Sequence, residues 1–124
     1  MKNFIKTSEA NSSERLELYR EGKGRSEKIY YLEIVSSYSN LFNLKKAELL
    51  REAALLNTEG KYTEELRLIA QKKLAAATIT GWNLEKSAGD YSKEAAENLL
   101  LTYPEIFDLV DRFSSNKENY IKKK

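Results

Sequence analysis

Two glycines near the N-terminus, Gly22 and Gly24, constrain the fold most strongly because they lie between two segments that favour β-strands. Glycine adopts positive φ without a steric cost, as a tight connection between antiparallel strands requires. The segment 15–20 before them partly alternates polar and apolar residues, and the segment 27–35 after them is rich in β-branched and aromatic residues. The sequence therefore predicts a β-hairpin over residues 15–35.

Two different faces are expected on the second strand of this hairpin. Tyr30, Leu32 and Ile34 share one side, whereas Ile29 and Tyr31 share the other. A hairpin alone is only marginally stable in water. One of its faces must therefore pack on helices or on another subunit.

Helical periodicity follows the hairpin along the rest of the chain. Apolar residues recur at helical spacing over about 41–56 and 63–80, with Gly60 as a left-handed stop between the two segments and Gly81 ending the second. The second helix has Thr63 as its N-cap and is apolar on two sides, so it is expected to be the core helix. The first carries one apolar stripe, formed by Phe42, Leu49, Ala53 and Leu56. Ser92 is suited to cap a helix over 92–102, and Pro104 to begin another over 104–115. We therefore expect an α+β fold, mostly α, in which an N-terminal β-hairpin is followed by about four helices.

The chain has 124 residues, the size of one compact domain. Residues 1–13 are polar and predict a flexible N-terminal arm, which is either a frayed terminus or a partner-binding tail. Residues 14–121 are expected to form a single α+β domain, and residues 122–124, all lysine, a basic tail. We find no internal repeat and no linker that would divide the chain.

Residues that carry common enzyme chemistry are missing from the sequence. It contains no His and no Cys, which removes the commonest general base near neutral pH, the commonest metal ligand and all thiol chemistry. The carboxylates lack the spacing of a calcium loop. The segment 22–24, Gly-Lys-Gly, is too short for a phosphate-binding loop. We expect no enzymatic activity, no catalytic residues, no metal site and no cofactor.

The charge distribution bears on nucleic acid and membrane partners. The net charge is +2, and residues 81–124 carry 7 basic and 8 acidic groups. A helix-turn-helix built from the two C-terminal helices would therefore lack the positive charge that phosphate contacts require, which argues against nucleic acid as a partner. No apolar run approaches the roughly 18–20 residues that span a membrane. The N-terminus also lacks the apolar core of a signal peptide.

Aromatic residues are the candidates for partner contact. Eight tyrosines and one tryptophan are spread along the chain. Such side chains supply large contact area in protein interfaces, but they also pack cores, and the sequence leaves both roles open. The candidate partner-binding residues are Tyr30, Tyr31, Trp82, Tyr91, Tyr103 and Phe107.

A series of short motifs marks the C-terminal third. In order they are Ile79-Thr80-Gly81-Trp82, Asp90-Tyr91-Ser92-Lys93-Glu94, Leu99-Leu100 and Tyr103-Pro104-Glu105-Ile106. This series resembles the C-terminal part of the tail assembly chaperones of long-tailed bacteriophages, and the resemblance extends over about residues 12–121. The chain departs from that pattern at Asp90-Tyr91, where the family often has a proline before the helix-starting serine.

The resemblance implies a non-catalytic role during phage assembly. Such chaperones coat the apolar, helical tape-measure protein and recruit tail-tube subunits in the host cell cytoplasm, and they leave the finished particle. Partner helices would be buried against an apolar or aromatic groove between helices, with the hairpin adding edge pairing. Two alternatives stay open: a permanent component of the tail or head-tail connector, located in the virion tail, and a small DNA-binding regulator. Self-association into a homo-oligomer is also left open.

Overall fold

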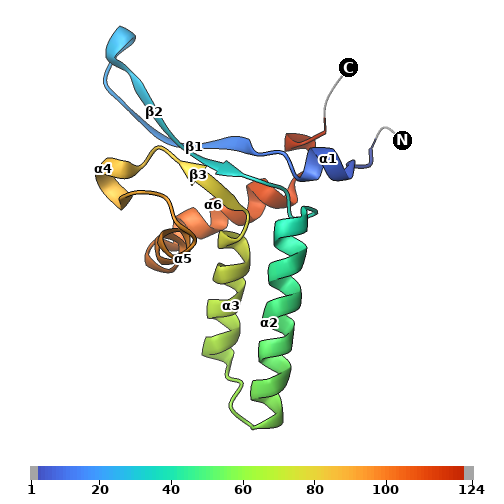
Figure 1. The fold of residues 1–124 in the computed structure, drawn as a ribbon. Helices are drawn as coiled ribbons and strands as arrows, with labels where there is room; N and C mark the ends of the chain where they lie inside the picture. The colour runs from blue at the N-terminus through green and yellow to red at the C-terminus, as the bar shows by residue number, and fades with distance from the viewer. Residues whose placement is uncertain (1–2, 122–124) are drawn as a thin grey trace.

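The computed structural model describes residues 3–121, so the predicted basic tail at 122–124 lies outside the described residues. The chain forms an α+β fold that is mostly helical, which confirms the predicted fold class (Figure 1). The elements in chain order are α1 (Thr7–Ala10), β1 (Glu14–Glu21), the 3₁₀ turn η1 (Gly24–Ser26), β2 (Lys28–Ile34), α2 (Asn40–Thr58), α3 (Glu64–Ala76), β3 (Ile79–Trp82), α4 (Glu85–Ala88), α5 (Lys93–Thr102), α6 (Pro104–Ser115) and the 3₁₀ turn η2 (Lys117–Asn119).

The predicted hairpin is present as β1 and β2. The strands pair antiparallel from Glu14 opposite Ile34 to Glu21 opposite Lys28, with a bulge between Glu17 and Tyr19. Gly22 has φ of 85°, and a Cβ placed there would lie 2.5 Å from the Ser26 carbonyl oxygen. The turn therefore depends on glycine at this position.

A third strand, β3, pairs antiparallel with β2 and corrects the prediction of a helix over 63–80. The helix ends at Ala76, and Ile79 pairs with Ile34 instead of adding a further helical turn. Residues 78–80 are all β-branched, which lowers the helical preference of this segment. The edge of β2 that does not pair with β1 has free backbone donors and acceptors, and residues 79–82 form hydrogen bonds with them. Gly81 therefore lies within a strand and is not a helix stop.

The N-terminal segment is packed where the sequence predicts a flexible arm. Thr7–Ala10 form one helical turn, and Ala10 is buried. The Ala10 carbonyl accepts a hydrogen bond from the Ser36 backbone N–H (3.1 Å). The Asn11 side chain accepts another from the Asn40 backbone N–H (2.8 Å). These hydrogen bonds attach the segment to the loop that leads into α2. The polar sequence of the segment does not predict them, because they depend on residues distant in the chain.

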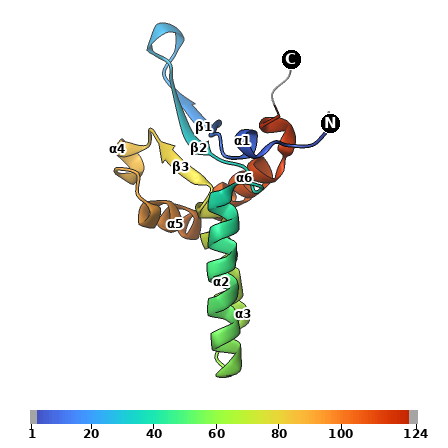
Figure 2. The same cartoon turned by 45° about the vertical axis from the view of Figure 1, so that its right-hand side comes forward.

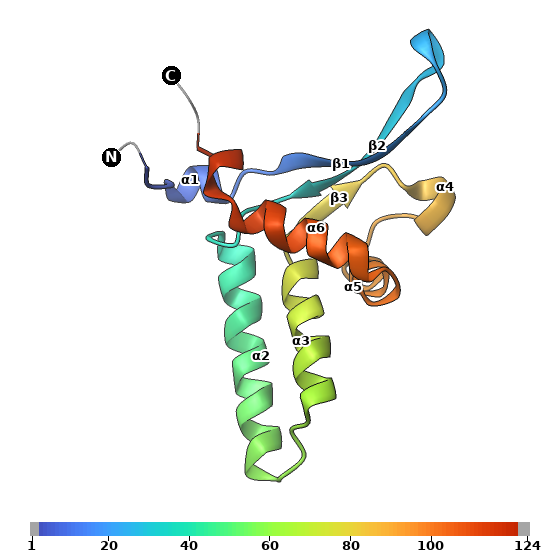
Figure 3. The same cartoon turned by 180° about the vertical axis from the view of Figure 1, so that it is seen from behind.

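The core lies between the sheet and the helices that cover one of its faces. Tyr30, Leu32 and Ile34 of β2 are buried together, as the alternation predicts. They form one cluster with Trp82 of β3, the C-terminal end of α3, α5 and α6. Figure 3 shows α6 crossing in front of α3 and below the sheet. Tyr120 closes the core near the C-terminal end, where its hydroxyl donates to the Ile34 carbonyl oxygen (3.2 Å).

The helices α2 and α3 lie side by side and extend away from the sheet, in the direction opposite to the tip of the hairpin (Figures 1 and 2). We call residues 40–76 the helical projection. Its end is the connection at Gly60, which has the predicted positive φ of 69°. The α3 helix begins at the predicted cap, since the Thr63 hydroxyl accepts from the Leu66 backbone N–H (3.2 Å).

Candidate protein-binding site

The helical projection leaves many apolar side chains in contact with solvent. No residue of α2 is buried, although Phe42, Leu49, Ala53 and Leu56 are half-buried along the predicted stripe. The exposed leucines of the projection are Leu41, Leu44, Leu50, Leu55, Leu66 and Leu68. Leu44 and Leu55 each expose 69% of their surface. Single exposed leucines are common, but Leu41, Leu44 and Leu55 share one side of α2, as in a surface that contacts another molecule.

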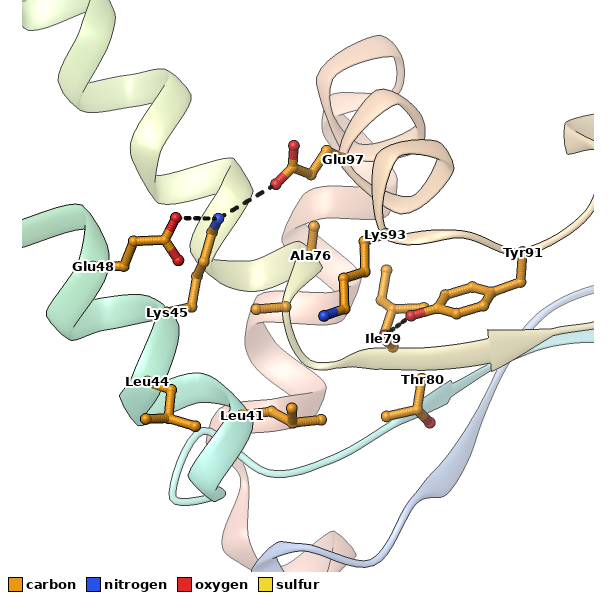
Figure 4. A pocket seen from close by; sticks show the side chains of 11 residues that line it. Leu41, Leu44, Lys45, Glu48, Ala76, Ile79, Thr80, Tyr91, Lys93 and Glu97 are labelled. Carbon is orange, nitrogen blue, oxygen red and sulfur yellow. Dashed lines mark hydrogen bonds and ion pairs between the residues drawn. The ribbon is translucent and has the colours of Figure 1, made fainter. Parts of the chain in front are cut away.

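A pocket lies at the base of the projection, where α2 and α3 meet the body (Figure 4). We call it the base pocket; its volume is about 450 Å³. The elements α2, α3, β3 and α5, with two residues of the connections between them, contribute its lining residues, which are Leu41, Leu44, Lys45, Glu48, Ala76, Ala77, Ile79, Thr80, Tyr91, Lys93 and Glu97. Leucine, alanine and isoleucine side chains make its wall largely apolar, as in sites that bind apolar groups.

Tyr91 lines the side of the base pocket that lies away from α2 (Figure 4). Its hydroxyl donates to the Ile79 carbonyl oxygen (2.6 Å), and its ring meets Trp82 edge-on, with the ring centroids 5.4 Å apart. Burial raises the pKa of the Tyr91 hydroxyl. The hydroxyl therefore stays protonated and donates its bond over the ordinary pH range. These contacts hold the ring in one orientation against β3.

Charged side chains surround the mouth of the base pocket. Lys45 of α2 lies 3.6 Å from a Glu48 carboxylate oxygen and 3.8 Å from one of Glu97 on α5. The ion pair between Lys45 and Glu97 links the projection to the body across the pocket. The side chain of Lys93 extends from the start of α5 toward the pocket in Figure 4. Among residues 3–121, no ion pair involves Lys93.

The six predicted partner-binding residues do not form one surface. Tyr30 and Trp82 are buried in the core, and Phe107 packs against it half-buried. Tyr91 is the one member of the set that lines the base pocket. Tyr103 is 54% exposed at the junction of α5 and α6, away from the lining of that pocket.

Tyr31, the sixth, lies on the open face of the hairpin. The Arg15 guanidinium stands 4.2 Å from the centroid of its ring. A shallow depression surrounds this pair, lined by Arg15, Glu17, Glu27, Lys28, Ile29 and Tyr31. Four of these six residues are charged, so charged groups border the depression.

The leucines of the projection are the surface that the sequence argument missed. The predicted stripe of α2 left Leu41, Leu44 and Leu55 without a role. On α3, Leu66 and Leu68 were expected to pack on two faces of a core helix, but they are 37% and 48% exposed. One signal was available: Leu41, Leu44 and Leu55 lie together outside the predicted stripe, so the segment carries more apolar residues than one packed face needs.

Among residues 3–121 no cluster of three acidic side chains has the arrangement of a metal site. Every buried side-chain nitrogen or oxygen atom there has a hydrogen-bond partner. None of the helices in this range is both long and apolar enough to span a bilayer.

Comparisons of the chain with protein-family models, with curated proteins and with solved structures give no match.

Proposed function

We propose that this protein is a non-catalytic assembly chaperone of a long-tailed bacteriophage, which holds an apolar helical segment of the tape-measure protein against its helical projection. The observation that carries the proposal is the row of exposed leucines on one side of α2, Leu41, Leu44 and Leu55, of which the first two line the base pocket. The motif series from Gly81-Trp82 to Tyr103-Pro104 adds the resemblance to tail assembly chaperones.

A helix is the kind of partner that this surface suits best. Two packed helices present a groove along their length, and an amphipathic helix can lay its apolar face into such a groove. Leu41 and Leu55 are 14 positions apart on α2, a distance of about 21 Å along the helix axis. A partner helix of about four turns would cover that length.

Co-expression with a fragment of the tape-measure protein encoded beside its gene tests the proposal. We expect the fragment to be soluble and to co-elute with the chain in gel filtration, and to aggregate when expressed alone. The double variant Leu44→Ser/Leu55→Ser should weaken the complex by at least about tenfold, because a buried leucine side chain contributes about 1.5–3 kcal/mol. Both positions are largely exposed, so the variant should fold normally.

The matched control is Leu101→Ser, which changes an exposed leucine on α5 outside the projection. It should solubilise the fragment as well as the natural chain does. The proposal is contradicted if the fragment aggregates equally with and without the chain, or if the double variant and the control solubilise it equally.

A further inference from the structure

We infer that the partner segment at the base pocket is an amphipathic helix with an acidic flank, whose apolar side chains enter the pocket while a carboxylate pairs with Lys93. This inference rests on the proposed function and adds the charge that its partner must carry.

The apolar wall of the pocket favours an extended occupant over a small molecule. Leu41 and Leu44 line the pocket from α2 and remain 45% and 69% exposed, so the pocket opens broadly to solvent. Leu55 lies further along α2 on the same flank as these two residues. An occupant that covers all three must continue beyond the pocket along the projection. A helix with apolar residues at regular spacing meets this requirement.

Three lysines in or beside the base pocket have no ion pair among the described residues. Lys93 extends toward the pocket without an ion pair among the described residues (Figure 4). On α3, Lys72 and Lys73 lie one helical turn before the pocket residue Ala76 and therefore share its face. They are half-buried, and neither has an ion pair within residues 3–121. Lys45 already pairs with both acidic residues of the lining.

The balance of charge at this surface is positive. The lining itself is neutral, with Lys45 and Lys93 against Glu48 and Glu97; Lys72 and Lys73, on the adjoining turn of α3, add two positive charges beside it. The projection as a whole, residues 40–76, also carries 7 basic and 5 acidic residues. Complementary charge speeds association and selects among partners with the same apolar stripe. An acidic flank on the partner is therefore favoured over a basic one.

A second copy of this chain fits the surface less well. Its acidic helix is α6, which carries Glu105, Asp108 and Asp111. The apolar face of α6 is already used, since Val110 is buried in the core and Phe113 packs against it. The most acidic helix of a second copy, α6, is therefore not free to enter the pocket.

Synthetic peptides of about 18 residues, long enough for the helix that the projection accommodates, test the inference with the full chain. An acidic peptide carries leucines at helical spacing with glutamate on both flanks of the stripe; its basic twin has lysine in place of every glutamate. A third peptide keeps the glutamates and has glutamine in place of the leucines. Fluorescence anisotropy of labelled peptides gives the dissociation constants.

We expect the acidic peptide to bind about tenfold more tightly than its basic twin, and the glutamine peptide not to bind. Lys93→Glu should remove most of this preference. The control Lys86→Glu, an equal charge change on α4 outside the pocket, should retain it. Leu44→Ser should weaken both leucine peptides.

Equal binding of the two leucine peptides, or a preference that Lys93→Glu leaves unchanged, overturns the inference. If Leu44→Ser weakens both peptides in that case, the proposed function survives. If neither leucine peptide binds the folded chain, the proposed function fails as well. Concentration-dependent self-association that Leu44→Ser abolishes would assign the pocket to a second copy and overturn the acidic partner.

Discussion

Tyr120→Phe is predicted to destabilise the protein at neutral pH and to protect it at alkaline pH. Tyr120 is 1% exposed, its hydroxyl donates to the Ile34 carbonyl oxygen (3.2 Å), and its ring meets Phe113 edge-on with centroids 5.9 Å apart. Phenylalanine keeps the ring contacts but removes the hydroxyl. At pH 7 the free energy of unfolding should therefore fall by about 1 kcal/mol, the net contribution of one hydrogen bond.

The alkaline half of the prediction follows from the pKa of Tyr120. Burial raises this pKa above its ordinary value, and the nearby carboxylate of Glu14 adds to the effect. An unfolded chain has the ordinary tyrosine pKa of about 10. The contribution of the neutral hydroxyl to stability is complete below about pH 10 and is lost as the pH rises above it. One unit higher, at pH 11, ionisation in the unfolded state lowers the stability of the natural chain by about 1.4 kcal/mol.

The two magnitudes place the crossing point of the natural chain and the variant near pH 11. Urea unfolding followed by the fluorescence of the buried Trp82 gives both free energies of unfolding, at pH 7 and at several values from 9.5 to 11.5. The exposed Tyr103 supplies the control Tyr103→Phe, which should match the natural chain throughout. A deficit of Tyr120→Phe that stays constant from pH 7 to 11.5 would refute the reasoning.

Three further predictions concern helix capping, exposed leucines and the turn glycines. Ser92→Ala removes the hydroxyl that accepts from the Ala95 backbone N–H (3.0 Å), so the free energy of unfolding should fall by about 1 kcal/mol in urea titrations. Leu44→Ser should change the free energy of unfolding by less than about 0.5 kcal/mol, because the side chain is exposed. Leu100→Ala, at a fully buried position, should lower it by about 2–5 kcal/mol. Equal effects of the two variants in thermal unfolding would contradict the exposure of Leu44. Gly22→Ala should lower the melting temperature more than Gly60→Ala, because both positions have positive φ but only at Gly22 does a Cβ meet the backbone of the turn.

Local sequence signals predicted most of the secondary structure. The glycines of the hairpin turn, the cap at Ser92 and the proline at the start of α6 act within a few residues, so they are visible without knowledge of the fold. The alternation along β2 also predicted that Tyr30, Leu32 and Ile34 share one face, although it did not say which face is buried. These features depend on backbone conformation and on periodicity, which the sequence states directly.

The candidate site was predictable only in part. Tyr91 was singled out from its residue type and lines the base pocket, but Trp82 and Tyr30 proved to be core residues. An aromatic side chain has the same local signature in a core and in an interface. Exposure separates the two roles, and exposure depends on how the elements pack.

The sequence by itself determined the hairpin, the approximate ends of α2, α5 and α6 and the lack of His and Cys, because each is a property of residues close together in the chain or of composition. Only the tertiary structure decided that residues 79–82 form a strand, since the choice depended on hydrogen bonds from β2, more than forty positions earlier. The tertiary structure also decided which leucines of α2 remain exposed. Those leucines are free because α2 packs on α3 alone over most of its length and extends beyond the body, an arrangement of whole elements that helical periodicity does not contain.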